Sequence, residues 1–291
     1  MVSPLDHKLL RDLWRMKGQA LAIGMVIAVG VGMLVMMTGL VTSLNETRAA
    51  YYERYRLAEV FAPVTRAPDR MVTRLAAVDG VSAVEPRVVG AALIDVADFD
   101  LPVQAQAVSL PDLRNPRLND VFLTDGRMID SDHADEILLL EAFAQAHDLR
   151  PGDRIDATMN GARRSFQVVG LAQAPEFLYT TAPGELIPDD ARFGVIWMSR
   201  SALAAAYDME GAFNEALLSL SRGANEAAVM DAVDRILDPY GGTGAYPLAD
   251  QASNQLVSEE ISGLEAAAAG VPPIFLAVAA FLLYIVINRM V

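Results

Sequence analysis

Cysteine is absent from this 291-residue chain, and lysine is nearly so, because only Lys8 and Lys17 occur. Without cysteine the chain forms no disulfide framework, no thiolate metal site and no cysteine nucleophile. The formal net charge is −14, and both lysines lie near the N-terminus, so the remainder is more acidic still. A region of that sign repels nucleic acid and the anionic face of a membrane, and we expect it to bind neither.

Histidine is also scarce, with only three in the chain, and no catalytic pattern surrounds them. The acidic stretch 130–136 matches no calcium-loop spacing, so we interpret it as a solvated loop. The glycines at 241–244 have no lysine and no helix start after them, which excludes a phosphate cradle, and no Walker motif occurs. We therefore expect no catalytic residue, no cofactor, no metal ion and no enzyme activity in this chain.

Long uncharged runs are what the sequence does contain. Residues 18–45 carry no charge, and neither do residues 266–288. A bilayer core about 30 Å thick needs roughly 20 apolar residues in a helix, and each run supplies them. The pattern predicts two transmembrane helices, the first an uncleaved anchor because its run is too long for a signal peptide.

Charge near the spans predicts the orientation. Residues 1–17 form a basic, amphipathic lead with interfacial anchors at Trp14, Arg15 and Lys17, and Arg289 follows the second run. Basic residues stay on the cytoplasmic side, so we expect both termini in the cytoplasm, including the short end 289–291. The acidic domain 46–265 then lies outside the bacterial inner or plasma membrane.

The first span carries small residues at four-residue spacing. These are Ala20, Gly24, Ala28 and Gly32, which share one face of a helix. A stripe of small residues lets another membrane helix approach closely. We expect this stripe to be a helix-packing face.

The middle of the chain reads as α+β. A strand–helix–strand pattern occurs in 46–117 and again in 199–265, as a split ferredoxin-like (βαβ…βαβ) subdomain with stalk segments requires. Between them, residues 118–198 read as an inserted β-rich subdomain, with an Asn160-Gly161 hairpin turn. Pro86 and Gly90 are expected to break the strands of 81–96.

The most specific stretch is EILLLEAFAQAHDLRPGDRIDATMNGARRSFQVVGLA. Its apolar strand Ile137–Leu140, its turn at Leu149–Asp153 and its strand end at Val168–Gly170 follow one another. Together with the basic lead, the glycine-rich first span and the return into a second span, it resembles the permeases of the MacB/FtsX/LolC type of ABC transporter.

That resemblance implies a permease subunit that does not hydrolyse ATP itself. Its partners would be a cytoplasmic ABC ATPase, the lipid bilayer, a second permease copy or the remaining permease half, and a periplasmic adaptor or substrate protein. The resemblance further implies mechanotransmission, with Asn45–Arg56 and Gln255–Glu265 as helical stalk segments. Family permeases have at least four spans, so we expect a half-permease, a truncated reading frame or a fragment.

Two other classes fit parts of the pattern. A two-span sensor would bind a ligand outside and signal inward. Such a sensor needs a cytoplasmic output module, which this sequence does not contain, although a truncation would also remove it. A fragment of an RND-type efflux pump would also repeat the strand–helix–strand unit, but the inserted β module and the absence of intramembrane carboxylates count against it. The transported substrate does not follow from the sequence.

Overall fold

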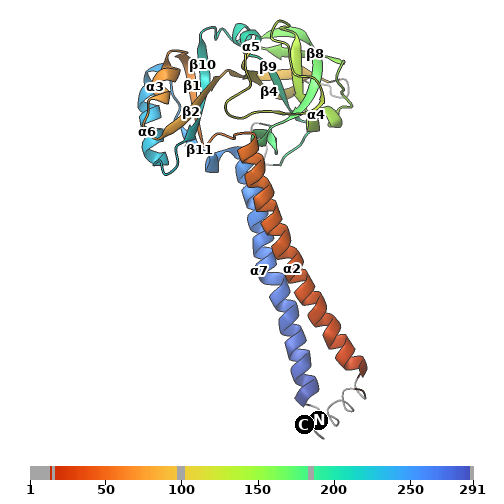
Figure 1. Cartoon of the computed structure of the whole chain (residues 1–291). Helices are drawn as coiled ribbons and strands as arrows, with labels where there is room; N and C mark the ends of the chain where they lie inside the picture. Colours follow the sequence, from red (N-terminus) through yellow and green to blue (C-terminus); the bar gives the residue numbers. More distant parts are fainter. Residues whose placement is uncertain (1–13, 15–16, 97–101, 183–186, 289–291) are drawn as a thin grey trace. The chain divides into compact units, whose positions relative to one another are not determined.

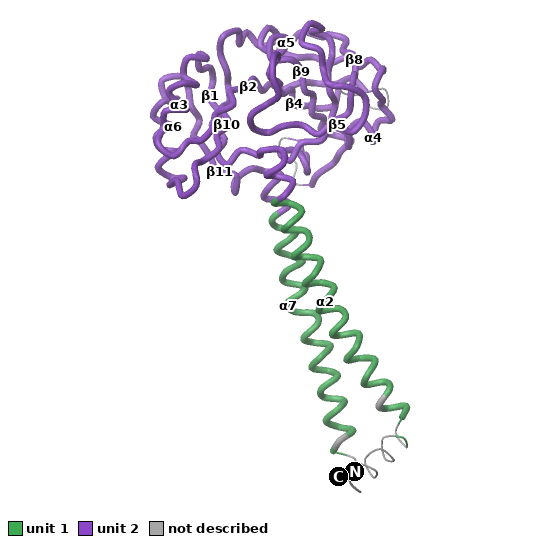
Figure 2. Tube along the Cα trace, in the orientation of Figure 1, with its two compact units in different colours: residues 1–49, 258–291 green, residues 50–257 purple. Residues whose placement is uncertain are grey.

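The computed structural model describes residue 14 and residues 17–96, 102–182 and 187–288. The chain forms two compact units (Figure 2). Unit 1 takes Met1–Ala49 with Ser258–Val291, and unit 2 takes Ala50–Val257. The predicted lead of residues 1–17 lies outside the described residues except for Trp14 and Lys17.

Two long helices form unit 1 and run side by side in Figure 1. They are α2 (Lys17–Arg54) and α7 (Ala252–Asn288). Both are long and apolar enough to cross a membrane. Helix α7 runs unbroken from the expected stalk Gln255–Glu265 through the expected span. Helix α2 runs unbroken through its span and into the expected stalk Asn45–Arg56, but it ends at Arg54, two residues before the expected end.

The contact between α2 and α7 contains both small and polar residues. A Cβ atom at Gly30 would lie 3.0 Å from Cδ2 of Leu276, so the absence of a side chain there permits close approach. Beyond the apolar run, Asn45 Nδ2 donates to Glu265 Oε1 at 3.3 Å, and Arg48 Nη1 donates to Ser258 Oγ at 3.1 Å. These bonds fix the antiparallel register of the helix pair.

Unit 2 begins with a small antiparallel sheet of order β11-β1-β10-β2. Its elements are β1 (Val60–Pro68), α3 (Met71–Ala76), β2 (Val81–Arg87), β10 (Ala212–Leu220), α6 (Glu226–Leu237), η2 (Asp238–Tyr240) and β11 (Tyr246–Pro247). Helices α3 and α6 supply Leu75, Val229 and Val233 to the apolar core against this sheet. Asn225 caps α6, because its Oδ1 accepts the backbone N–H of Ala228.

The larger sheet of unit 2 has the order β5-β8-β6-β9-β4-β3-β7, and β7 also pairs with β8. Six of its strands therefore close into a barrel, with β5 outside the ring. The elements are β3 (Val89–Asp95), β4 (Val103–Leu110), β5 (Phe122–Gly126), β6 (Glu136–Leu140), α4 (Glu141–Ala146), β7 (Arg154–Met159), β8 (Ala162–Gln173), η1 (Pro175–Phe177), β9 (Phe193–Ser199) and α5 (Arg200–Ala206). Trp197, Phe143 and Phe166 fill its core.

The division of unit 2 differs from the expected one. Strands β3 and β4 precede residue 118, yet they belong to the larger sheet, because β4 pairs in parallel with β9 and β3 pairs with β7. Pro86 and Gly90 also lie within β2 and β3 instead of breaking them. Strand β2 is at the edge of its sheet, where a residue without an N–H is tolerated.

Several local predictions are confirmed. The Asn160-Gly161 turn joins β7 to β8, and both residues have positive φ, +47° and +76°, as a two-residue hairpin turn requires. The apolar strand predicted at Ile137–Leu140 is β6. These features depend on neighbouring residues, so the sequence alone identifies them.

Candidate functional site

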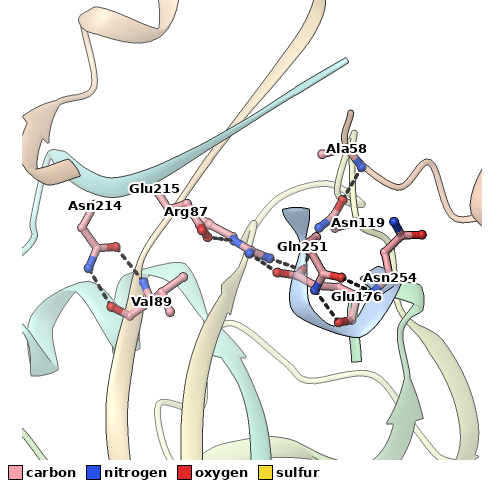
Figure 3. A network of polar contacts seen from close by, with 9 residues as sticks. All are labelled: Ala58, Arg87, Val89, Asn119, Glu176, Asn214, Glu215, Gln251 and Asn254. Carbon is pink, nitrogen blue, oxygen red and sulfur yellow. Dashed lines mark hydrogen bonds and ion pairs between the residues drawn. The ribbon is translucent and has the colours of Figure 1, made fainter. Parts of the chain in front are cut away.

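The candidate site is a buried polar network in unit 2 at the ends of α2 and α7 (Figure 3). The Tyr52 hydroxyl, in the last turn of α2, donates to Oδ1 of Asn254, in the first turn of α7, at 3.1 Å. Asn254 in turn donates its side-chain amide to the carbonyl oxygen of Leu248 at 2.9 Å. The two helices are thus joined to each other where they meet the folded domain.

Gln251 connects the start of α7 to the segment after β8. Its Oε1 accepts the backbone N–H of Asn254 at 2.7 Å, which satisfies one of the free donors at the helix start. Its Nε2 donates to the carbonyl oxygen of Glu176 at 2.9 Å. Ser253 adds a further bond, since its Oγ accepts the backbone N–H of Tyr179 at 3.0 Å.

An arginine with two carboxylates lies at the centre of the network. Arg87, at the end of β2, donates from Nη1 to Glu176 Oε2 at 2.7 Å and from Nη2 to the other oxygen of Glu176. Its Nε donates to Glu215 Oε2, on β10, at 2.5 Å. Arg87 and Glu176 are only 4% and 6% exposed, so this bidentate pair is shielded from water.

Asn119 extends the network to the chain segment that follows α2. Its Nδ2 donates to Glu176 Oε2, and its Oδ1 accepts the backbone N–H of Ala58, both at 2.7 Å. Nearby, Arg56 donates to the carbonyl oxygens of Pro116 and Arg117, each at 2.8 Å. The end of α2 is therefore held by the loop before β5 as well as by α7.

The charges of the network do not cancel, because one guanidinium faces two carboxylates. Burial opposes the charge on Arg87, but Glu176 and Glu215 outweigh it and raise the pKa of Arg87 above its ordinary value. Burial raises the pKa of Glu215 although Arg87 lies against it. Burial, with Glu215 and Glu176 nearby, also raises the pKa of Tyr246.

The buried polar network around Arg87 and Glu176 is suited to holding the strands, loops and helix ends of unit 2 together. Removing one member of a buried ion pair costs roughly 3–5 kcal/mol, because the other member stays buried and unpaired. The hydrogen bonds to Glu176 come from β2, from the loop before β5 and from the start of α7. Glu176 therefore connects the start of α7 to β2 and to the loop before β5.

The predicted packing stripe of small residues on α2 is not part of this polar network. A Cβ atom at Gly24 or Gly32 would meet nothing within 4 Å, whereas Gly30 faces α7. Ala28 is exposed like these two glycines, and the side chain of Ala20 lies outside the described residues. The stripe thus faces away from α7, and its packing against another helix stays a prediction.

The predicted interfacial anchors are described in part. The ammonium of Lys17 lies 5.5 Å from the centroid of the Trp14 ring, a distance at which a cation is attracted by the ring face. Trp14 is 72% exposed. Arg15 lies outside the described residues, and the role of these residues as interfacial anchors stays a prediction.

The acidic stretch 130–136 is less solvated than expected at one position. Glu136 is buried, and its Oε2 accepts from Nη1 of Arg127 at 2.7 Å. His133 lies 3.4 Å from Asp130, and Nε2 of His147 is 2.9 Å from the carbonyl oxygen of Ala191. Within the described ranges no three histidine or acidic side chains are grouped so as to hold a metal ion.

Sequence reasoning did not identify the network residues. The signal that was available is the occurrence of charged residues in largely apolar strands, as at Arg87 in VEPRVV and Glu215 in FNEALL. Buried charges in such strands need partners. Which partners they find depends on segments more than 85 residues apart, such as Arg87 and Glu176, separated by 89 positions.

Comparison with protein families matches residues 23–236 to the MacB-like periplasmic core domain. The extracellular domain of the noncanonic ABC-type transporter YknZ from Gram-positive bacteria is similar, with 11% identity and a TM-score of 0.41, covering 66% of this chain and 98% of that one. The periplasmic region of MacB from Actinobacillus actinomycetemcomitans has 10% identity and a TM-score of 0.41, covering 72% and 95%. A comparison with curated proteins finds no match.

Proposed function

The chain belongs to the family of ABC-transporter permeases with a MacB-like periplasmic core domain, and we propose that it couples ATP hydrolysis to movement of that domain. The hydrolysis takes place in a separate cytoplasmic ATPase subunit, and this chain is the membrane-spanning, non-catalytic part. Its task is export or extraction of a substrate by mechanotransmission. The observation that carries the proposal is the buried network that ties the ends of α2 and α7 to the domain.

The coupling depends on stiffness. A flexible joint between a span and the domain would absorb a displacement of a few ångströms, whereas an unbroken helix transmits it. Both α2 and α7 continue without a break beyond their apolar runs, which supports this role. At the domain end, Gln251 is hydrogen-bonded both to the backbone of Asn254 on α7 and to the carbonyl oxygen of Glu176. The side chain of Glu176 in turn pairs with Arg87, so a movement of α7 would displace these residues as well.

We also propose that the small sheet of unit 2 is a split ferredoxin-like layer. The small sheet has the strand–helix–strand pattern twice, and its order β11-β1-β10-β2 supports a split ferredoxin-like layer. We take the barrel, from β3 to β9, as the insertion within this layer. Both termini lie in the cytoplasm and the domain outside, with a second permease copy or the remaining permease half completing the membrane part.

A pair of matched insertions tests the coupling. Seven residues are added to α2 after Ala50 and to α7 after Gln255, between the Arg48–Ser258 and Tyr52–Asn254 hydrogen bonds. Seven residues make nearly two turns, so both helix faces stay in register. Seven alanines in each helix keep the stalk stiff, whereas seven glycines cost about 1 kcal/mol per position and make it flexible.

We expect the transporter, reconstituted with its ATPase, to move substrate with the alanine insertions. With the glycine insertions it should still hydrolyse ATP but lose transport. If both versions transport equally, the domain is a passive tether, and a ligand-binding or scaffolding role of the domain becomes the better interpretation.

A further inference from the structure

A cavity on the barrel of unit 2 lies apart from the polar network. Its volume is about 790 Å³, and it is lined by β3, β4, the β7–β8 turn, Phe193 and Tyr207. Cavities of roughly 300–1,000 Å³ are typical of small-molecule sites. The proposed coupling function does not use this cavity.

Small residues on β3 make room for the cavity. Gly90, Ala91 and Ala92 follow one another on this strand and line the cavity. A Cβ atom at Gly90 would lie 2.2 Å from Cζ of Tyr207, so the tyrosine ring occupies the space that any larger residue at position 90 would need. The depression thus depends on residues that carry little or no side chain.

The walls of the cavity are held in place by hydrogen bonds. The Tyr207 hydroxyl donates to the carbonyl oxygen of Ala91 at 2.5 Å, which fixes the ring against β3. Asn160, in the β7–β8 turn, donates its side-chain amide to the carbonyl oxygen of Ala206 at 3.1 Å. The turn and the end of α5 are therefore joined, and the cavity is formed before any ligand arrives.

The chemistry of the lining contrasts with the rest of the chain. Charged residues make up 21% of the sequence, yet all thirteen described lining residues are uncharged types. Burial raises the pKa of Tyr207 to about 12, so its hydroxyl stays neutral at physiological pH. Leu93 and Phe193 add apolar surface, while Gln104 and Thr158 offer amide and hydroxyl groups. A charged ligand would lose its hydration here without gaining a counter-charge.

We propose that this cavity binds an uncharged small molecule with an apolar body and a few hydrogen-bonding groups. The apolar body lies on the small residues of β3, and the polar groups meet Gln104 and Thr158 at the edge. Because none of the described lining residues is charged, the lining favours an uncharged ligand over a cation or an anion.

Two photoreactive probes of the same shape test the proposal. Benzophenone is uncharged, and 4-benzoylbenzoate is the same molecule with a carboxylate. The full chain in lipid nanodiscs is irradiated with each probe, and the adducts are mapped to peptides by mass spectrometry. Mapping separates adducts in unit 2 from those that benzophenone forms with the apolar helices.

We expect benzophenone adducts on the peptides of β3 and β4, at least about tenfold above those of the carboxylate. Ala91→Trp fills the cavity from an exposed position and should abolish them, whereas Ala227→Trp, on the exposed side of α6, should leave them unchanged. If Ala91→Trp does not fold, Gln104→Trp on the neighbouring strand replaces it. Equal labelling by both probes, or adducts that survive the filling variants, would overturn the proposal and leave the coupling function standing.

Discussion

Replacing Arg87 by methionine should strongly destabilise unit 2. Methionine has a similar length but no charge, so Glu176 and Glu215 would stay buried without their cation. Loss of one member of such a group costs roughly 3–5 kcal/mol. For a unit the size of Ala50–Val257, 1 kcal/mol lowers Tm by roughly 2–4 °C, so the expected decrease is about 6–20 °C.

Tryptophan fluorescence during heating measures this change in the full chain. Trp197 is 2% exposed, and its ring centroid lies 5.8 Å from that of Phe177, next to Glu176. Its emission therefore reports on unfolding close to the network. The other tryptophan, Trp14, is replaced by phenylalanine in every variant, so that only unit 2 contributes to the signal.

A surface arginine provides the control. Arg222 is exposed, and Arg222→Met should change stability by no more than about 0.5 kcal/mol. Adding Glu176→Gln and Glu215→Gln to Arg87→Met removes the unpaired charges and should restore part of the lost stability. The reasoning is refuted if Arg87→Met lowers Tm no more than Arg222→Met does, or if the triple variant is less stable than the single one.

Three further predictions concern protonation, helix packing and orientation. The pKa of Glu215 is raised on folding above its ordinary value of 4.5, so its contribution to stability is complete below that pH and declines as pH rises through the folded pKa. Wild type should therefore lose stability relative to Glu215→Gln from about pH 4.5 upward, and parallel pH curves from urea unfolding would contradict this. Gly30→Leu should weaken cross-linking between α2 and α7. Gly32→Leu should leave this cross-linking intact and reduce only contacts with other subunits. Equal effects of the two variants on α2–α7 cross-linking would mean that neither helix face is specific. Cysteines placed at Ser3 and Ser221 of this cysteine-free chain should differ in labelling by an impermeant thiol reagent, and labelling of position 3 in intact cells would overturn the orientation.

Features with a local signal were predictable from the sequence. An uncharged run indicates a helix long enough to cross a membrane, since length and hydropathy alone decide that question. The Asn160-Gly161 turn and strand β6 likewise follow from neighbouring residues. The stretch from Ile137 to Gly170, together with the basic lead and the two apolar runs, indicated the family to which the chain belongs.

Non-local features required the tertiary structure. Strand β4 pairs in parallel with β9, about ninety residues later, so no periodicity near β3 and β4 assigns them to the barrel. The network around Glu176 is similar, because its donors come from Arg87, Asn119 and Gln251. A charged residue in an apolar strand indicates that a buried partner is needed, but only the folded structure shows which residue that partner is.

The helix pair illustrates the same division. Four small residues at regular spacing defined a stripe on α2 from sequence, and three of them, Gly24, Ala28 and Gly32, are exposed in the structure. Which face meets α7 depends on the rotation of both helices, and the structure brings Gly30 to Leu276 instead. The sequence by itself determined the helices and their apolar surfaces, whereas their register and contacts were decided by packing, because a helix offers several faces and only its neighbour selects one.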